Sequence, residues 1–426
     1  MINWMTEKMK KKETQNNESM PEIMHAFSIF ILYIIIISAN VCNAIVLTGI
    51  DNFLLHYSNL VKNKRIGIVT NQTGYTSAGI RTIDAIRELP DATLGAVFTP
   101  EHGLTGTVHA GEQVLSYFDT SLGVNVYSLY GRQRKPTPEM LKGIDLLIYD
   151  IQDIGVRSYT FISTLGLVMQ SASENNIPVV VLDRPCPLAM HIDGNVLDTA
   201  YRSFVGMYPI PYVYGMTPGE LARMINEEGM VGKRCDLTVI PVLNWQRSMT
   251  WEETGLRWIP PSPNIPHPST VAYYAAFGVI GELGIGAYTG IGTSEAFRIF
   301  SLPHLDCKKI QALFTKDGMQ GIRCSPYDTI MMNGGKSRPI EGIKFYIALD
   351  KAGDLTVAGL ELISLLVKMR AISSPDSAHS AMFTKVCGSP YLERILDGEP
   401  IAQISREWEP DREKFLAIRK KYLLYR

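Results

Sequence analysis

The sequence lacks several features that would assign a function directly. Its 426 residues include six cysteines but no C-x-x-C pair, which argues against a zinc or dithiol redox site. The formal net charge is −1 and no basic stripe is present, so nucleic acid is not an expected partner. No repeat of fixed period occurs, which excludes solenoids and propellers. No Walker or G-x-G-x-x-G pattern follows the first predicted strand, and no G-x-S-x-G pattern occurs. We therefore expect no bound cofactor or metal.

The first 44 residues have the composition of a secretory signal peptide. Four lysines between residues 8 and 12 precede an almost wholly apolar run over residues 27–39. Cys42-Asn43-Ala44 then provides the small residues of a cleavage site. This pattern predicts a periplasmic or secreted protein. If the segment is not cleaved, it is expected to act as a membrane anchor, the only membrane contact that the sequence predicts.

The rest of the chain alternates short apolar runs with helical patterns. From residue 45 to 287 this alternation predicts a Rossmann-like, doubly wound α/β domain with a parallel sheet. Its crossover helices are expected over residues 80–89, 138–142 and 159–175. This alternation of apolar runs and helical patterns ends after a glycine-rich stretch. Residues 288–426 are expected to form a smaller α+β domain that completes an active-site cleft.

Two local patterns are more specific. Thr217-Pro218-Gly219-Glu220 is a capping box with proline at the first helical position, so Glu220 is expected to cap a helix. Residues 258–268 contain five prolines and can form neither a helix nor a central strand. This segment is expected to be a rigid loop, either a ligand wall or a plain connection.

Polar residues follow five of the predicted strands. The carboxyl ends of parallel strands lie along one edge of a sheet, where ligands bind. The loops that should meet there begin at Asn71, at Glu101, at Tyr130, at Asp150 and at Asp183. The sequence therefore predicts one crevice that gathers residues far apart in the chain.

Carboxylates provide the chemistry in these loops. Glu101 would be partly desolvated, which suits a general acid. Asp150 and Asp153 could act as a general base, bind a divalent cation or hold Arg157 in place. Asp183 and Arg184 could form an ion pair or bind a ligand. The tyrosines, amides and arginines near these groups suit a sugar. A hydrolase that binds a metal through three aspartates is a further alternative.

Several motifs together resemble the bacterial exo-β-N-acetylmuramidase family. They cover nearly all of the chain after the signal peptide and are TNQTG (70–74), FTPEHG (98–103), YDIQDIGVRSYTFISTL (149–165), LDRPCPL (182–188), GMTPGELA (215–222), PPSPNIP (260–266) and KKYLLY (420–425). The resemblance implies an enzyme that releases terminal N-acetylmuramic acid from the non-reducing ends of peptidoglycan fragments, with the active site between a Rossmann-like domain and a smaller one.

The resemblance also implies roles for individual residues. Glu101 matches the family's catalytic glutamate and is assigned here as the acid. Asp150 and Asp153 are the expected catalytic partners in water activation or charge stabilisation. The expected substrate-binding residues are Asn71, His102, Gln152, Arg157, Tyr159, Asp183, Arg184, Tyr214, Asn264 and Glu282.

The sequence departs from the family's usual pattern in two places. Relatives usually carry Arg-His where this chain has Val213-Tyr214, and they carry a Glu-Gly-Thr-Asn stretch where Glu282 is followed by Leu283-Gly284. An arginine and a histidine are natural partners for the lactyl carboxylate of muramic acid. The departures leave two alternatives: an enzyme for a related amino sugar, or a non-catalytic protein that binds peptidoglycan fragments.

Overall fold

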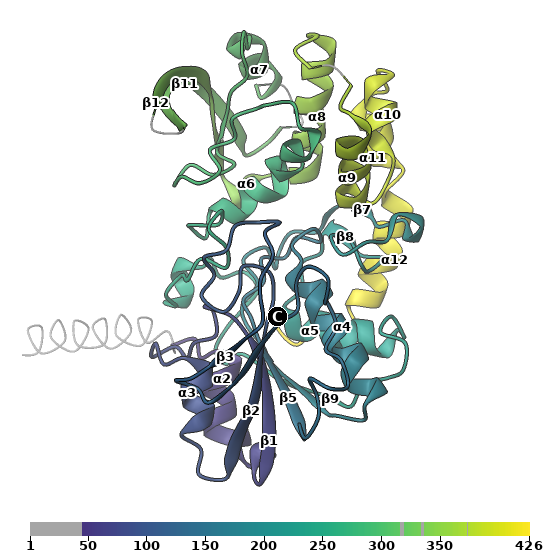
Figure 1. Cartoon of the computed structure of the whole chain (residues 1–426). Helices are drawn as coiled ribbons and strands as arrows, with labels where there is room; N and C mark the ends of the chain where they lie inside the picture. The colour runs from purple at the N-terminus through teal and green to yellow at the C-terminus, as the bar shows by residue number, and fades with distance from the viewer. Residues whose placement is uncertain (1–44, 316–318, 334–335, 373) are drawn as a thin grey trace, which may run out of the picture. The chain divides into compact units, whose positions relative to one another are not determined.

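The computed structural model describes residues 45–315, 319–333, 336–372 and 374–426. The predicted signal peptide over residues 1–44 lies outside the described residues. Within the described ranges, no helix is both long and apolar enough to cross a membrane. The α/β prediction is confirmed, because a mostly parallel central sheet with helices is accompanied by a smaller part with a separate sheet (Figure 1).

The central sheet has seven strands in the order β3-β4-β2-β1-β5-β6-β9. All neighbours pair in parallel except β3, which runs antiparallel to β4 at the edge. The strands are β1 (Lys64–Thr70), β2 (Ala92–Thr99), β3 (Tyr117–Asp119), β4 (Val124–Ser128), β5 (Leu146–Asp150), β6 (Val179–Leu182) and β9 (Leu237–Ile240). The order reverses direction at β1, so the polar loops that follow β1, β2 and β5 meet near a topological switch point.

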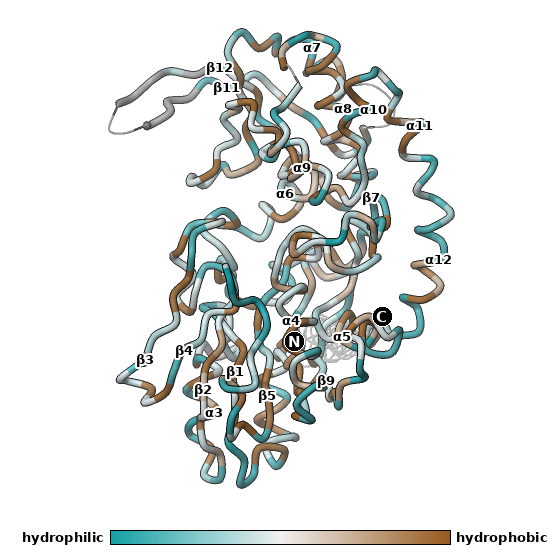
Figure 2. Tube along the Cα trace, turned by 45° about the vertical axis from the view of Figure 1, so that its right-hand side comes forward, coloured by the Kyte–Doolittle hydropathy of each residue, from teal (hydrophilic) through white to brown (hydrophobic). Residues whose placement is uncertain are grey.

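Alternating side chains of the inner strands enter two separate cores. In β5, Leu147 and Tyr149 face the larger core, whereas Leu146 and Ile148 face the smaller one. The smaller core contains residues of α2 (Gly49–Asn52) and α3 (Thr82–Arg87). The larger contains residues of α4 (Phe161–Glu174) and α5 (Pro218–Glu227). A sheet buried on both faces explains why its strands are continuous apolar runs, and the inner strands are largely brown in Figure 2.

The local predictions mostly agree with the structure. Helices α3 and α4 lie within the predicted ranges 80–89 and 159–175, and α5 begins with the capping box of Thr217 and Glu220. The helix predicted over residues 138–142 is wrong. One helical bond, from the Leu141 N–H to the Thr137 carbonyl, closes a single turn, and the left-handed Gly143 (φ 74°) then ends it.

The smaller part has its own antiparallel sheet, in the order β10-β12-β11. Its strands are β10 (Ile299–Phe300), β11 (Ile322–Asn333) and β12 (Lys336–Ile347). A two-stranded ladder joins β7 (Asp193–Val196) to β8 (Pro211–Val213). The remaining helices are α6 (Thr270–Phe277), α7 (Cys307–Leu313), α8 (Leu355–Lys368), α9 (Ser377–Cys387), α10 (Tyr391–Leu396), α11 (Ile401–Arg406) and α12 (Glu409–Arg419). The domain boundary after residue 287 stays a prediction.

Asp193 fastens β7 to the start of α8. Its carboxylate accepts hydrogen bonds from the Leu355 N–H (2.8 Å) and the Thr356 hydroxyl. Burial raises the pKa of Asp193 to about 7. The carboxyl is therefore protonated in the folded state at pH values where the unfolded chain has already released the proton.

This pKa predicts how stability depends on pH. A raised carboxyl pKa contributes stability below the unfolded pKa of about 4, and this contribution is lost as the pH rises towards 7. The free energy of unfolding should fall across that window by up to about 1.4 kcal/mol per pH unit for this group. In Asp193→Asn the side-chain oxygen can still accept from the Leu355 N–H, and the amide can donate to the Thr356 hydroxyl. This substitution should reduce the slope, measured by urea unfolding at pH 5 and pH 7. Identical slopes in variant and wild type would contradict the prediction.

Candidate active site

A cavity of about 520 Å³ opens beside the carboxyl ends of β2, β4 and β5. Its walls also include the proline-rich loop, helix α6 and helix α9, so distant segments of the chain contribute to it. The polar and charged residues that line it are Glu101, His102, Tyr130, Arg134, Ser158, Tyr159, Thr160, Ser203, Ser262, Asn264, Tyr274, Glu282 and Lys385. A cavity of this size with such a lining suits a small polar ligand such as a sugar.

Glu101 stands in the loop that follows β2. The turn is tight, because His102 (φ 72°) and Gly103 (φ 77°) both adopt left-handed backbone conformations. The two carboxyl oxygens of Glu101 have different partners. Oε1 accepts a hydrogen bond from the Gly111 N–H (3.1 Å), and Oε2 accepts one from the Thr160 hydroxyl (2.6 Å). These bonds fix the carboxyl group on the cavity wall.

The partners of Glu101 tolerate a change in its protonation state. A backbone N–H such as that of Gly111 can only donate, whereas a hydroxyl can donate or accept. The Thr160 hydroxyl can therefore turn to accept a proton that sits on Oε2. The phenol of Tyr130 also hydrogen-bonds to Glu101, and burial is the main cause that raises the pKa of this phenol. Glu101 thus has the surroundings of a group that gives up and regains a proton.

His102 adds a nitrogen base to the same wall. Its Nδ1 lies 2.7 Å from the carbonyl oxygen of Val108, so Nδ1 donates in this contact. In the neutral ring this leaves the lone pair on Nε2. The ring also meets Phe161 edge-on, with centroids 6.5 Å apart. His102 is suited to accept a hydrogen bond from a ligand hydroxyl.

Glu282 is the second carboxylate of the lining. It belongs to the 3₁₀ helix η5 (Gly278–Leu283), which directly follows α6. Burial raises its pKa, and the charge of His379 acts in the opposite direction. A raised pKa makes a carboxylate a stronger base when it is ionised. Glu101 and Glu282 are the two carboxylates among the described residues of this lining.

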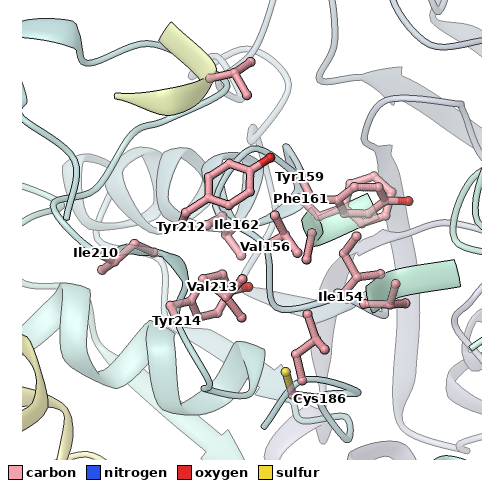
Figure 3. Packing of buried hydrophobic residues seen from close by; sticks show 14 of the residues in the cluster. Ile154, Val156, Tyr159, Phe161, Ile162, Cys186, Ile210, Tyr212, Val213 and Tyr214 are labelled. Carbon is pink, nitrogen blue, oxygen red and sulfur yellow. The ribbon is translucent and has the colours of Figure 1, made fainter. Parts of the chain in front are cut away.

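Tyrosine rings support the floor of the cavity. Tyr159 packs edge-on against Phe161 and Tyr274. The Ser158 hydroxyl lies 3.1 Å from the Tyr212 hydroxyl and 3.0 Å from that of Tyr274. Figure 3 shows the underlying core, in which the side chains that follow β5 pack against those of β8. This support holds the lining residues of the β5–α4 loop in place.

Asp150 does not line the cavity. It is fully buried at the end of β5, where Arg184 binds both of its oxygens (2.5 and 2.9 Å). The Thr82 hydroxyl donates a further hydrogen bond to it. Arg184 also donates to the Tyr75 carbonyl (2.9 Å). The structure thus places the predicted catalytic aspartate in a buried ion pair that joins β5, β6 and α3.

Asp153 is also buried beneath the site. It accepts hydrogen bonds from the Gly155 N–H (2.8 Å) and from the Tyr214 hydroxyl. Burial raises its pKa to about 6. Neither Asp153 nor Tyr214 is among the residues that line the cavity. The departure from the family pattern at Val213-Tyr214 therefore lies in the core.

Arg157 is a fully buried connector. It donates to the carbonyls of Asn195 (2.6 Å), Ile210 (2.7 Å) and Cys387 (2.6 Å). Burial lowers its pKa to about 10. These bonds tie the β5 loop to β7 and to the end of α9, so the structure gives Arg157 no direct place in the cavity.

The other predicted binding residues lie in three further places. Asp183 accepts from Gly219, Thr217 and Tyr425, which docks the C-terminal segment on the start of α5. Asn71 accepts from the Thr73 N–H (2.9 Å) and holds the turn after β1. Gln152 and Arg184 line a separate cavity of about 230 Å³ beside Trp251. Of the predicted residues, the large cavity therefore collects Glu101, His102, Tyr159, Asn264 and Glu282.

The sequence did not single out several residues of this lining. Thr160 lies within the YDIQD motif, and Tyr130 follows a predicted strand, so position gave some signal for both. Arg134 gave none, because it lies in an ordinary basic stretch with Arg132 and Lys135. Lys385 gave none, because it is a single cation in a helical segment. Among the described residues, no group of three or more histidines, cysteines, aspartates or glutamates is arranged to hold a metal ion.

The fold and the cavity define a class of protein. A Rossmann-like sheet with two carboxylates, tyrosines, one amide and hydroxyls around a sugar-sized cavity is typical of an enzyme that acts on carbohydrates. Residues 66–269 match the family "Exo-beta-N-acetylmuramidase NamZ, N-terminal", and residues 272–425 match "Exo-beta-N-acetylmuramidase NamZ, C-terminal". The chain belongs to the exo-β-N-acetylmuramidase NamZ family and is a glycoside hydrolase, which confirms the predicted resemblance.

Individual relatives support this assignment. The chain is 37% identical over 382 residues to the peptidoglycan β-N-acetylmuramidase NamZ of Bacillus subtilis (strain 168), covering 89% of this chain and 91% of that protein. Two crystal structures of DUF1343 family proteins from Bacteroides fragilis NCTC 9343 are also similar. They give TM-scores of 0.83 at 38% identity and 0.69 at 29% identity, and each comparison covers 89% of this chain and 99% of the other.

Proposed function

We propose that this protein removes terminal N-acetylmuramic acid from the non-reducing ends of peptidoglycan fragments. The observation that carries the proposal is the cavity, where one fixed donor and hydroxyls hold Glu101 and a second carboxylate, Glu282, belongs to the same lining. The close similarity to the Bacillus subtilis enzyme supports the same sugar. The family membership favours catalysis over the alternative of a non-catalytic binding protein.

Glu101 serves as the general acid in this proposal. Its proton passes from Oε2 to the glycosidic oxygen, and the bond between that oxygen and the anomeric carbon breaks. The Thr160 hydroxyl, which had accepted this proton's hydrogen bond, turns to donate to the carboxylate that forms. The Gly111 N–H stabilises the same negative charge.

Glu282 serves as the general base. Its raised pKa suits removal of a proton from the water whose oxygen adds to the anomeric carbon and completes hydrolysis. The sequence favoured Asp150 or Asp153 for this task. Because Arg184 and Tyr214 hold these aspartates outside the cavity lining, we assign the role to Glu282 instead.

Export belongs to the same proposal. Peptidoglycan lies outside the cytoplasmic membrane, and the lysine-rich, apolar start of the chain has the composition of a signal peptide. We therefore place the protein in the periplasm or outside the cell. Mass spectrometry of the N-terminus of the mature protein would test this, and recovery of an intact Met1 from the soluble cytoplasmic fraction would contradict it.

Turnover of defined substrates tests the activity. The purified protein is expected to release 4-nitrophenol from the β-N-acetylmuramide and muramic acid from a disaccharide with that sugar at its non-reducing end. An N-acetylglucosaminide should react at least about tenfold more slowly, because it lacks the charged lactyl group. Addition of a chelator is the control for metal dependence and should not change the rate on the muramide or on the glucosaminide. Binding without turnover of any of these substrates would overturn the enzymatic proposal.

A further inference from the structure

The cavity carries positive as well as negative groups. Arg134 lies in the segment between β4 and β5, and Lys385 lies in the last turn of α9. Both line the cavity, and both are exposed. Within the described residues, neither belongs to an ion pair. Two cations without a carboxylate partner on one cavity wall are available for an anionic ligand.

Arg134 is oriented before any ligand binds. Its guanidinium carbon lies 4.4 Å from the centre of the Phe204 ring. A guanidinium stacked on an aromatic face keeps its N–H edge free and loses little rotational freedom when it binds a carboxylate. The phenol of Tyr130 also feels the charge of Arg134, so this cation lies near the group that contacts Glu101.

Phe204 belongs to a short turn over residues 203–206, and this turn also packs against the backbone of Lys385. Ser203 and Gly206 exchange backbone hydrogen bonds (2.9 and 3.2 Å), which closes the turn that presents Phe204. A Cβ atom at Gly206 would lie only 3.2 Å from the Lys385 carbonyl oxygen, so the turn packs closely on the end of α9. The 203–206 turn therefore contacts both cationic residues.

A hydroxyl accompanies the two cations. Ser203 lines the cavity, and its Oγ is buried without a hydrogen-bond partner among the described residues. A buried hydroxyl without a partner is unfavourable unless a ligand supplies one. The lining thus offers two charged donors and one neutral donor around a single turn.

We propose that Arg134, Lys385 and Ser203 form the site that binds the lactyl carboxylate of the muramic acid ring. This inference rests on the proposed function and names the residues that give it specificity. A carboxylate beside Glu101 or Glu282 would be repelled, whereas this wall attracts it. The site also explains how a chain with Val213 and Tyr214 in its core can select a charged sugar.

The test compares a charged substrate with a neutral one. The 4-nitrophenyl β-N-acetylmuramide and its lactyl amide have the same shape and differ by one negative charge. Arg134→Gln and Lys385→Gln should each lower the ratio of kcat/KM for the acid to kcat/KM for the amide by about tenfold to a hundredfold. Ser203→Ala should lower the ratio by less. In wild type, high salt should reduce the ratio as well.

Matched controls separate this effect from general surface charge. Arg132 is an exposed neighbour of Arg134 outside the cavity lining, and Lys368 occupies the last turn of α8 as Lys385 does in α9. Arg132→Gln and Lys368→Gln should keep the wild-type ratio. A double variant of Arg134 and Lys385 that keeps the ratio, in a protein that cleaves muramides, would overturn the inference and leave the proposed function standing. If the wild-type protein turns over neither muramide, the proposed function and this inference are both overturned.

Discussion

Glu101→Gln is expected to lower kcat on a muramic-acid-terminated disaccharide by about 10²–10⁴-fold, the contribution typical of a positioned proton donor. Glutamine keeps the shape of the side chain. Its oxygen can accept from Gly111 and its amide can donate to Thr160, so the fold should be unaffected. The loss should be much smaller on a 4-nitrophenyl glycoside, whose leaving group departs without a proton. Steady-state kinetics on both substrates measure this difference.

Two further variants make the result specific. Glu282→Gln should slow both substrates to a similar extent, because a better leaving group does not replace the base that activates water. Glu112→Gln changes an exposed carboxylate in the same loop as Glu101, outside the cavity lining, and should keep the wild-type kcat. If Glu101→Gln retains wild-type turnover of the disaccharide, Glu101 is not the acid.

The fold could be predicted because its cause is local and repeated. Strand segments buried on both faces are mostly apolar, and β6, the buried part of β1 after Arg65 and β5 up to Asp150 are such runs in the sequence. The helix that was wrongly predicted over residues 138–142 shows where the local sequence pattern is not sufficient. Proline and good helix formers favour a helix there, but Gly143 ends the turn before a second one can form.

The site was predictable only in part, because the position of a residue in a loop does not give the direction of its side chain. Asp150 and Glu101 both follow apolar runs, yet Asp150 is still the last residue of β5, and its side chain meets Arg184 and Thr82 in the interior. Glu101 lies two residues beyond the end of β2, in a left-handed turn that faces the cavity. Arg134 and Lys385 join the site only through tertiary packing.

Asp150→Asn is expected to lower the free energy of unfolding by about 3–5 kcal/mol, because it leaves the buried Arg184 without its counter-charge. Arg184→Met should cost a similar amount for the converse reason. The double variant should be much less destabilised than the sum of the two, since neither charge then remains unpaired. Urea unfolding of the four proteins at pH 7 measures these free energies.

An exposed pair provides the matched control. Arg81 and Asp84 form an ion pair with side chains 49% and 37% exposed, and Asp84→Asn should change the free energy of unfolding by less than about 1 kcal/mol.

The kinetics of Asp150→Asn, at a temperature where the variant stays folded, distinguish a catalytic role of Asp150 from a structural one. A catalytic aspartate predicts a kcat loss of 10²-fold or more at nearly unchanged stability, about the contribution of an acid–base group. The buried ion pair predicts the reverse, because Asp150 acts on the site only by holding β5, β6 and α3 together.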